Sequence, residues 1–485
     1  MGFPNTKTWT PGLLVRLPVV LMILVLTGCA AVGPNYVPPE TTAPSSWHTE
    51  LEGGLTAKEA DPQTLANWWA TLNDPELSSL IERAVAGNLN LKKAVATVRE
   101  ARARRGVSQT NLFPTLDATG SANRSRSSEE TGSRQTRELY AAGFDASWEL
   151  DIFGGVRRSI EAAEANLQAS QEGLRDVLVS LVAEVALNYV EARTYQATLA
   201  VAEANLKAQQ ETYQLTRWRY EAGLSDELAV DQARYNLEST RSQIPTLRTG
   251  LEGAKNRLAV LVGEPPGTVH GELAEPRPIP VTPLEVAVGV PADTLRHRPD
   301  VRQAERELAA QTARIGVATA DLYPKFTLKG SIGLEALSLG NLISSGSRTY
   351  SIGPRITWPI FDAGAIRQNI EVQSALQEQA LIQYEAAVLS ALEEVENALV
   401  AYANEQVRRQ SLLEATQAAE RAVNLARTRY ASGLIDFQVV LDAERSLLSL
   451  QSQLAQSDGA VTSNLISLYK VLGGGWTSLN SDDKT

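Results

Sequence analysis

The sequence predicts a mixed fold that combines long α-helices with short amphipathic β-strands and uses the same unit twice. Three observations predict it. Motifs recur at a constant offset of 210 residues, as between Arg219 and Arg429. Two long stretches, 155–221 and 365–430, contain no proline, and four segments of about ten residues alternate apolar with polar side chains. Each observation predicts one part of the fold: a duplication, long helices and half-buried strands.

The duplication is visible at four separated places. Residues 219–224 read Arg-Tyr-Glu-Ala-Gly-Leu, and residues 429–434 read Arg-Tyr-Ala-Ser-Gly-Leu. The other matches at this offset are Trp148 with Trp358, Phe113-Pro114 with Tyr323-Pro324, and Val262-Gly263 with Leu472-Gly473. Self-similarity at a fixed offset indicates that each half of the chain is the same supersecondary unit.

Each unit is expected to contain one long helix and one return helix. The predicted pairs cover about 155–221 with 226–262, and about 365–430 with 436–472. At 1.5 Å per residue the longer helices extend roughly 100 Å. Gly223 and Gly433 are suited to end the long helices, and Asp226 and Asp436 to cap the return helices. No compact core covers a helix of that length, so the helices are expected to line a coiled-coil-like wall. Pro245 is expected to bend its helix.

The N-terminus is typical of an exported lipoprotein. Lys7 and Arg16 precede an apolar run at 17–26 that is too short to span a bilayer, as in a secretory signal. The run ends Leu-Thr-Gly-Cys, which resembles the bacterial lipobox, and Cys29 is therefore predicted to be lipidated. Ala30 follows, where an aspartate would favour retention at the inner membrane. The outer membrane is the expected destination.

The alternating segments are interpreted as membrane strands. Tyr140, Phe144 and Trp148 share one face of such a strand, while Asp145 and Ser147 share the other. A soluble four-stranded sheet would show the same alternation. Segment length, aromatic residues near the segment ends and the export signal favour strands that cross a membrane. The strands are expected at about 115–127, 138–150, 325–336 and 349–360.

Four strands are too few to close a barrel, because single-chain barrels begin at eight strands. An open sheet edge in lipid leaves backbone groups unpaired, which costs several kcal/mol for each group. Several chains must therefore combine their strands. Three chains give twelve strands and twelve long helices, although counting alone also permits a dimer or a larger ring.

The composition favours neither an enzyme nor a nucleic-acid-binding protein. The formal net charge of -11 gives no attraction for nucleic acid. Cys29 is the only cysteine, and the three histidines are far apart in the sequence. No spacing typical of a zinc protease, a serine hydrolase or a phosphate-binding loop occurs. No catalytic residue, cofactor or metal site is expected.

These features together resemble the outer-membrane factor family, the TolC-like proteins, and within it the NodT-type lipoprotein branch of efflux channels. The resemblance covers nearly the whole mature chain. Its most characteristic motif is Arg296-His297-Arg298-Pro299-Asp300-Val301. Other motifs that carry it are Trp68-Trp69, Asp74-Pro75, the two Arg-Tyr-x-x-Gly-Leu turns, Asp151-Ile152-Phe153-Gly154-Gly155 and Phe361-Asp362-Ala363-Gly364.

The resemblance implies a trimeric 12-stranded transmembrane β-barrel continued by a 12-helix periplasmic α-barrel. The expected domains are a signal peptide (1–28), a lipid-anchored extended segment (29–67), a first repeat (68–264), an equatorial linker (265–298), a second repeat (299–474) and a tail (475–485). The implied function is a passive, gated exit duct in the outer membrane for drugs or metals. The implied partners are two sister chains, outer-membrane lipid, a periplasmic adaptor and an inner-membrane RND-type pump.

The resemblance also implies the site residues. The adaptor is expected to dock at the turns, on Arg219, Tyr220, Gly223, Leu224, Arg429, Tyr430, Gly433 and Leu434. Relatives close the duct with an apolar ring and an acidic ring four residues later on the return helix. These positions fall on Gln438, which departs from the apolar type, and on Asp442.

Purely structural roles are alternatives for the charged candidate residues. Asp442 could instead form an ion pair with Arg445, three residues on along the same helix. For Asp226 and Asp436 a capping role is favoured over a role in the pore. For Arg296, Arg298 and Asp300 a structural role in the collar is favoured.

Two alternative functions stay open from the sequence. One is the exit duct of a type I protein secretion system, which would share the channel but carry other cargo. The other is a periplasmic structural lipoprotein with coiled coils and a small soluble sheet. The sequence does not identify the cargo, the partner pump or the open and closed states.

Overall fold

The computed structural model describes residues 31–40, 43–59, 61–130, 135–280 and 285–476. The chain divides into two compact units. The unit that we call the strand unit comprises Met1–Pro39, Val98–Ser170 and Ala304–Tyr384. The unit that we call the helical unit comprises Glu40–Thr97, Gln171–Gln303 and Glu385–Thr485. The predicted signal peptide and Cys29 lie outside the described residues.

The duplication is confirmed by the lengths of the elements. The long helices α5 (Gly155–Glu221) and α9 (Ala365–Ala431) each have 67 residues. Their return helices α6 (Glu227–Leu261) and α10 (Phe437–Val471) each have 35 residues. The helices that precede the strands, α4 (Leu89–Thr110) and α8 (Pro299–Ala320), each have 22 residues. Equal lengths at equal offset show that each half folds as the same unit.

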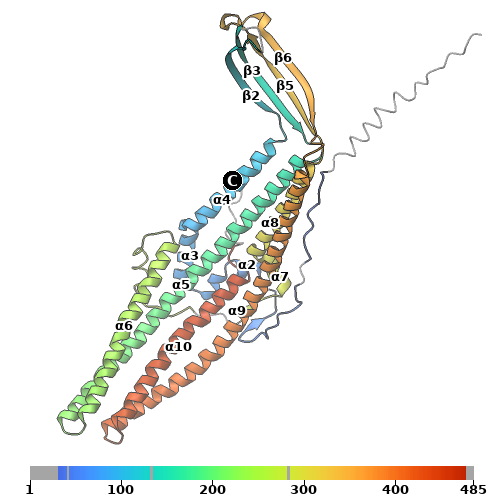
Figure 1. Ribbon diagram of the computed structural model, residues 1–485. Helices are drawn as coiled ribbons and strands as arrows, with labels where there is room; N and C mark the ends of the chain where they lie inside the picture. Colours follow the sequence, from blue (N-terminus) through green and yellow to red (C-terminus); the bar gives the residue numbers. More distant parts are fainter. Residues whose placement is uncertain (1–30, 41–42, 60, 131–134, 281–284, 477–485) are drawn as a thin grey trace, which may run out of the picture. The chain divides into compact units, whose positions relative to one another are not determined.

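The strand unit contains an antiparallel sheet with the order β2-β3-β5-β6 (Figure 1). The 3₁₀ helices η2 (Leu339–Asn341) and η3 (Ser345–Ser347) lie between the last two strands. Strands β2 and β6 each have one side without a partner among the described residues. The strands are β2 (Thr115–Arg126), β3 (Thr136–Leu150), β5 (Lys325–Ala336) and β6 (Arg348–Thr357).

One face of this sheet is apolar across all four strands. Phe144 pairs with Ala118 on one side and with Ile332 on the other, and Ile332 pairs with Tyr350. Directly paired residues point to the same face, so these four side chains form one apolar row. The neighbouring row on the opposite face is polar and consists of Asp117, Asp145, Ser331 and Ser351. The predicted alternation is therefore in register across the whole sheet.

The duplication extends to individual hydrogen bonds at the base of the sheet. The indole Nε1 of Trp148 donates to the carbonyl of Leu112 at 2.9 Å, and that of Trp358 donates to the carbonyl of Leu322 at 3.0 Å. Each tryptophan thus fastens its strand to the end of the preceding helix. The rings of Phe153 and Tyr323 stack nearby with centroids 4.6 Å apart.

The helical unit contains two helical hairpins, one formed by α5 with α6 and one by α9 with α10 (Figure 1). Among the described helices, none is long and apolar enough to cross a membrane. Pro245 lies inside α6, which continues through it. The shorter elements are α2 (Pro62–Ala66), η1 (Trp68–Leu72), α3 (Pro75–Gly87) and α7 (Pro291–His297).

Residues 29–67 were expected to be extended, but their described part contains α2 and a short strand. This strand, β1 (Leu55–Thr56), pairs in parallel with β4 (Val286–Ala287), so it is tied to the equatorial linker. The N-cap Asp61, whose carboxylate accepts from the backbone N–H of Thr64 at 3.0 Å, explains why the chain turns into a helix there.

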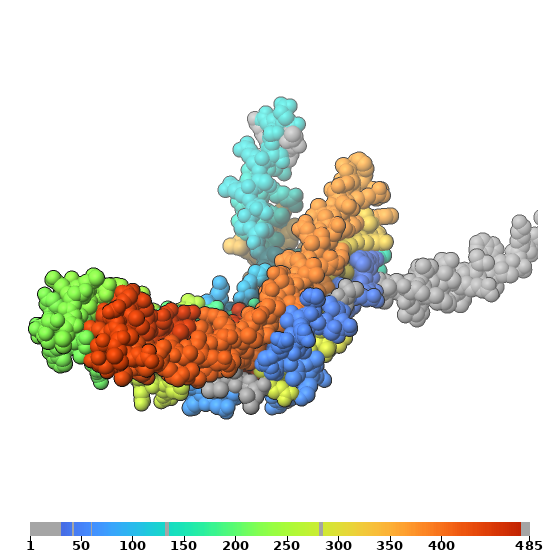
Figure 2. Space-filling view, turned by 90° about the horizontal axis from the view of Figure 1, so that it is seen from below, coloured from blue at the N-terminus to red at the C-terminus, as the bar shows by residue number. Residues whose placement is uncertain are grey.

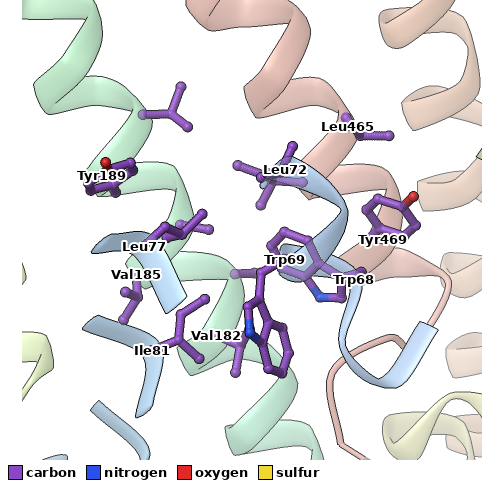
Figure 3. Packing of buried hydrophobic residues seen from close by; sticks show 14 of the residues in the cluster. Trp68, Trp69, Leu72, Leu77, Ile81, Val182, Val185, Tyr189, Leu465 and Tyr469 are labelled. Carbon is purple, nitrogen blue, oxygen red and sulfur yellow. The ribbon is translucent and has the colours of Figure 1, made fainter. Parts of the chain in front are cut away.

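The core of the helical unit surrounds the two adjacent tryptophans of η1. Trp68 is almost completely buried, stacks on Tyr469 of α10 at 5.4 Å and meets Trp69 edge to face at 6.0 Å (Figure 3). Leu77 and Ile81 of α3 and Val182 and Val185 of α5 pack in the same cluster. The core therefore joins the start of the first repeat to the long helix α5 and to α10 of the second repeat.

Candidate functional site

The two predicted turns connect the long helices to the return helices and have the same geometry. Gly223 has φ +72° and Gly433 has φ +73°. The N–H of Leu224 donates to the carbonyl of Arg219 at 2.8 Å, and the N–H of Gly223 to that of Tyr220 at 2.9 Å. The second turn repeats this pair of bonds, which is the Schellman ending of a helix. Glycine adopts such a positive φ without steric cost, which most other residues do not.

The two turns lie side by side at the ends of the hairpins, as Figures 1 and 2 show. We call the turns with the adjoining ends of their helices the tips. A small apolar cluster holds them together, with Ala229 and Ala233 from α6, Tyr430 from α9 and Phe437 and Leu441 from α10. The structure thus brings together residues of both repeats that sequence reasoning assigned separately to adaptor docking.

The eight docking candidates have different surroundings. Leu224 and Leu434 at the turns are both exposed. Tyr430 is buried, and the Arg219 guanidinium lies 4.8 Å from the centre of its ring. Arg219 also donates to the carbonyls of Tyr430 and Ala431, at 3.1 and 3.2 Å. Tyr220 and Arg429 are exposed.

Sequence reasoning missed a buried carboxylate next to the tips. Glu444 of α10 is only 3% exposed and accepts from the Thr212 hydroxyl of α5 at 2.7 Å. It also forms an ion pair with Arg427 of α9 at 2.8 Å. One residue thus ties α10 to both long helices. Its position on the face of Phe437, Val440 and Leu441, seven residues after Phe437, was the signal that could have found it.

The two gate candidates are neighbours on an exposed face of α10. The amide Nε2 of Gln438 donates to Oδ1 of Asp442 at 2.9 Å. The alternative ion pair between Asp442 and Arg445 does not form. Arg445 instead donates to Oδ1 of Asn236 at 3.2 Å and lies 4.7 Å from the ring centre of Tyr235. Arg445 is thus directed toward α6, and the Asp442 carboxylate has no cationic partner in the described residues.

The capping interpretation holds in full for one aspartate. The Asp226 carboxylate accepts from the backbone N–H of Ala229 at 2.9 Å. Asp436 occupies the N-cap position of α10 with an extended backbone, but its side chain makes no capping hydrogen bond. The expected side-chain cap at Asp436 is therefore wrong, although this residue does mark the start of the helix.

Two residues of the Arg-His-Arg-Pro-Asp-Val motif, Arg298 and Asp300, form structural contacts of the predicted kind, whereas Arg296 is exposed and lies 3.6 Å from Asp293. The buried Arg298 guanidinium is paired with Asp300 and with Glu394 of α9, both at 2.7 Å, and donates to the carbonyl of Val471 at 3.1 Å. Burial raises the pKa of the Asp176 carboxyl, and the nearby charge of Asp300 raises it further. The motif thus ties the start of α8 to α9 and to the end of α10.

The first described residues of the chain are held by one buried arginine in the strand unit. We call residues 31–36 the strap. Arg158, near the start of α5, donates to the carbonyls of Val32 and Gly33 at 3.0 and 3.2 Å and to Oδ1 of Asn35 at 2.7 Å. The Tyr36 hydroxyl donates to Glu305 of α8 at 3.0 Å. The strap begins two residues after the predicted lipidation position.

Comparison with known proteins agrees with this geometry. The sequence model of the family described as "Outer membrane efflux protein" matches residues 80–264 and 290–474, one match for each repeat. Nodulation protein T of Rhizobium leguminosarum bv. trifolii is 34% identical over 90% of this chain and 92% of its own length. The cation efflux system protein CusC of Escherichia coli O6:H1 is 33% identical over 93% of this chain and 97% of its own.

Solved structures show the same fold. The outer-membrane channel OprN has a TM-score of 0.86 and 36% identity, covering 92% of this chain and 100% of its own. The open state of the MtrE channel of Neisseria gonorrhoeae has a TM-score of 0.78 and 29% identity, covering 92% and 99%. With both repeats matched and nearly the full length covered, the chain belongs to the outer membrane efflux protein family.

Proposed function

We propose that three copies of this chain form the exit duct of a tripartite efflux pump in the outer membrane. An inner-membrane RND-type transporter and a periplasmic adaptor deliver small molecules to it, and the duct is a passive, gated path that catalyses no reaction. The names of relatives support efflux: TtgI of Pseudomonas putida, 32% identical, is a toluene efflux pump outer membrane protein, and CusC belongs to a cation efflux system.

The exposed apolar face of the sheet carries this proposal. Ile332 is 65% and Tyr350 is 85% exposed, although both are paired within the sheet. Soluble monomers rarely expose a contiguous apolar surface of this kind. In lipid the same face is favourable, and the free edges of β2 and β6 must then be paired, because unpaired backbone groups are too costly there. Three chains close twelve strands into one barrel.

A matched pair of substitutions on β5 tests the placement in lipid. Ile332→Lys puts an ammonium group on the apolar face and is expected to cost about 2–4 kcal/mol at mid-membrane depth. It should abolish heat-stable trimers in outer-membrane extracts and conductance in planar bilayers. Ser331→Lys, one residue earlier on the polar face, should retain both and shift ion selectivity toward anions. Equal behaviour of the two variants would support a soluble sheet and the structural-lipoprotein alternative.

The gate is proposed on α10 at Asp442 and Gln438. Three Asp442 carboxylates around the axis of a trimer would form an acidic ring, and the exposed, cation-free setting of this side chain supports that role. Asp442→Ala should raise basal conductance without lowering the yield of trimer. Asp231→Ala, which removes an exposed carboxylate from α6, is the matched control and should leave conductance unchanged. Unchanged conductance in Asp442→Ala would remove this residue from the gate.

The tips are proposed as the docking surface for the adaptor, with Arg219, Tyr220, Gly223, Leu224 and their counterparts in the second repeat. The exposed leucines supply the apolar part of this surface. Leu224→Asp combined with Leu434→Asp should abolish pump-dependent drug resistance and capture of the adaptor. The conductance of purified trimers should stay normal, which separates docking from duct formation. Normal resistance would place the adaptor elsewhere.

The anchor and the domain limits are also proposed from the sequence. Residues 1–28 form the signal peptide, Cys29 carries the lipid, and the repeats extend over 68–264 and 299–474, with 265–298 as the linker. Cys29→Ala should abolish incorporation of labelled palmitate and still give inserted trimers, because the barrel itself holds the protein in lipid. A variant found wholly in the soluble periplasmic fraction would contradict the barrel.

A further inference from the structure

The Arg-Tyr pair at the tips is duplicated in sequence but used only once within the chain. Arg219 of the first repeat contacts Tyr430 of the second, and Tyr430 is 3% exposed. The complementary members, Arg429 and Tyr220, are both exposed, and Tyr220 reaches 44%. Each repeat therefore contributes one residue to the contact and leaves the other residue of its Arg-Tyr pair exposed.

The contact that is formed has two parts. The Arg219 guanidinium lies over the Tyr430 ring, a cation–π arrangement. Its Nη1 also donates to the last carbonyls of α9, those of Tyr430 and Ala431, which have no partner inside the helix. A cation at a helix C-terminus is further favoured by the helix dipole. The contact requires only an arginine and the end of a neighbouring long helix.

The end of α5 offers the same acceptors, but no arginine binds them among the described residues; the Tyr220 carbonyl accepts only from the turn N–H of Gly223, as that of Tyr430 does from Gly433. This helix end has the same Schellman turn, the exposed ring of Tyr220 and the helix-end carbonyls of Tyr220 and Glu221. A Cβ added to Gly433 would lie 3.8 Å from Nη2 of Arg219, whereas one added to Gly223 would meet no atom within 4 Å. The position beside Gly223 that corresponds to the arginine is therefore open. In the described residues the Arg429 guanidinium makes no hydrogen bond or ion pair.

An apolar residue one turn earlier shows the same asymmetry. Leu215 of α5 packs against the tip cluster, while Leu425, its counterpart on α9 at the same offset, is 53% exposed. The face of α5 that carries Leu215 and Arg219 thus has a copy on α9 whose two corresponding residues, Leu425 and Arg429, are exposed. This copy carries Arg429 at its end.

We propose that Arg429 binds the end of α5 in a second copy of this chain, with its guanidinium over that copy's Tyr220 ring and its N–H groups on the carbonyls of Tyr220 and Glu221. In a ring of copies the repeats alternate, so the second repeat of one copy precedes the first repeat of the next. A contact between two different surfaces closes when the rotation closes. Three copies then join their tips by six similar Arg-Tyr contacts, three within chains and three between them. The inference rests on the proposed trimer.

Cysteine cross-linking tests the contact, because Cys29 is the only native cysteine. Tyr220→Cys combined with Arg429→Cys, treated in membranes with a short bis-maleimide, should give covalent dimers and trimers on denaturing gels. The control pair, Arg219→Cys with Tyr430→Cys, should consume its thiols and stay at the mass of one chain. Arg429→Cys alone should give no ladder. Thiol consumption by the test pair without any ladder would overturn the proposal.

A double-mutant cycle on basal conductance gives a second test. Arg429→Ala and Tyr220→Leu should each raise conductance by at least about two- to fivefold, the change expected for one surface cation–π contact, since each variant removes three such contacts from a trimer. The double variant should do no more than either single variant, because both remove the same contact. Multiplicative effects would contradict the proposal. Heat-stable trimers in all variants show that a failure concerns this contact and not the trimeric duct.

Discussion

The core around Trp68 and the sheet of the strand unit differ in the exposure of their apolar side chains. In the helical unit they are buried within one chain, where Trp68, Leu77 and Leu465 are almost fully inaccessible. In the sheet, Ile332 and Tyr350 are arranged in register and left exposed. The difference teaches that one chain completes its helical core alone, while its sheet needs lipid and other chains to be complete.

The largest expected effect comes from breaking the core. Trp68→Ala removes a buried ring that stacks on Tyr469, and such truncations cost about 3–5 kcal/mol. Urea unfolding of detergent-solubilised protein, followed by circular dichroism, should show the loss. Trp218→Ala, at an exposed position on α5, should change stability by no more than about 0.5 kcal/mol. Similar losses of unfolding free energy in the two variants would mean that the core around Trp68 is not the main source of stability of the helical unit.

An intermediate effect is expected from the sheet, where two strands approach at a pair of glycines. A Cβ on Gly143 would lie 2.8 Å from the carbonyl oxygen of Ile332, and one on Gly333 would meet that of Ala142 equally closely. Gly143→Val should therefore cost about 1–3 kcal/mol, as overpacking does, and lower the yield of heat-stable trimer. Gly120→Val, whose Cβ has its nearest neighbour at 4.0 Å, should leave the yield unchanged. Equal yields would argue against tight β3–β5 pairing.

The smallest expected effect is on the pH dependence of stability, and it comes from Asp176 in the helical unit. Burial, with Asp300 nearby, raises the pKa of Asp176 above its ordinary value. A raised carboxyl pKa contributes stability that is fully present below the unfolded-state pKa and is lost as the pH rises through the folded-state value. Asp176→Asn should remove this part of the pH dependence, so its urea midpoint should fall less between pH 4 and pH 7 than that of the parent. If the urea midpoints of Asp176→Asn and of the parent changed equally with pH, the raised pKa of Asp176 would be contradicted.

The main elements could be predicted because they depend on local patterns. Alternation located all four strands, and proline-free stretches ended by glycine located both hairpins, since each of these signals lies within one element; the repeat at an offset of 210 residues then supported the same elements in both halves. The turns at Gly223 and Gly433 followed from the positive φ that their helix endings require.

The contacts that organise the tips could not be predicted because their partners are distant in the sequence. Arg219 meets the end of α9, and Glu444 meets Thr212, across more than two hundred residues. The suggested pair of Asp442 with Arg445 failed for the same reason. Local spacing allowed it, but Asn236 and Tyr235 on another helix bind the arginine.

The even number of strands per chain has a consequence for how copies meet. With the order β2-β3-β5-β6 and every pairing antiparallel, the outermost strands of one sheet point in opposite directions. When β6 of one copy lies beside β2 of the next, that seam is antiparallel as well. The hydrogen-bond pattern can then continue around the circumference without changing type, whereas an odd strand count would force a parallel pairing at every junction.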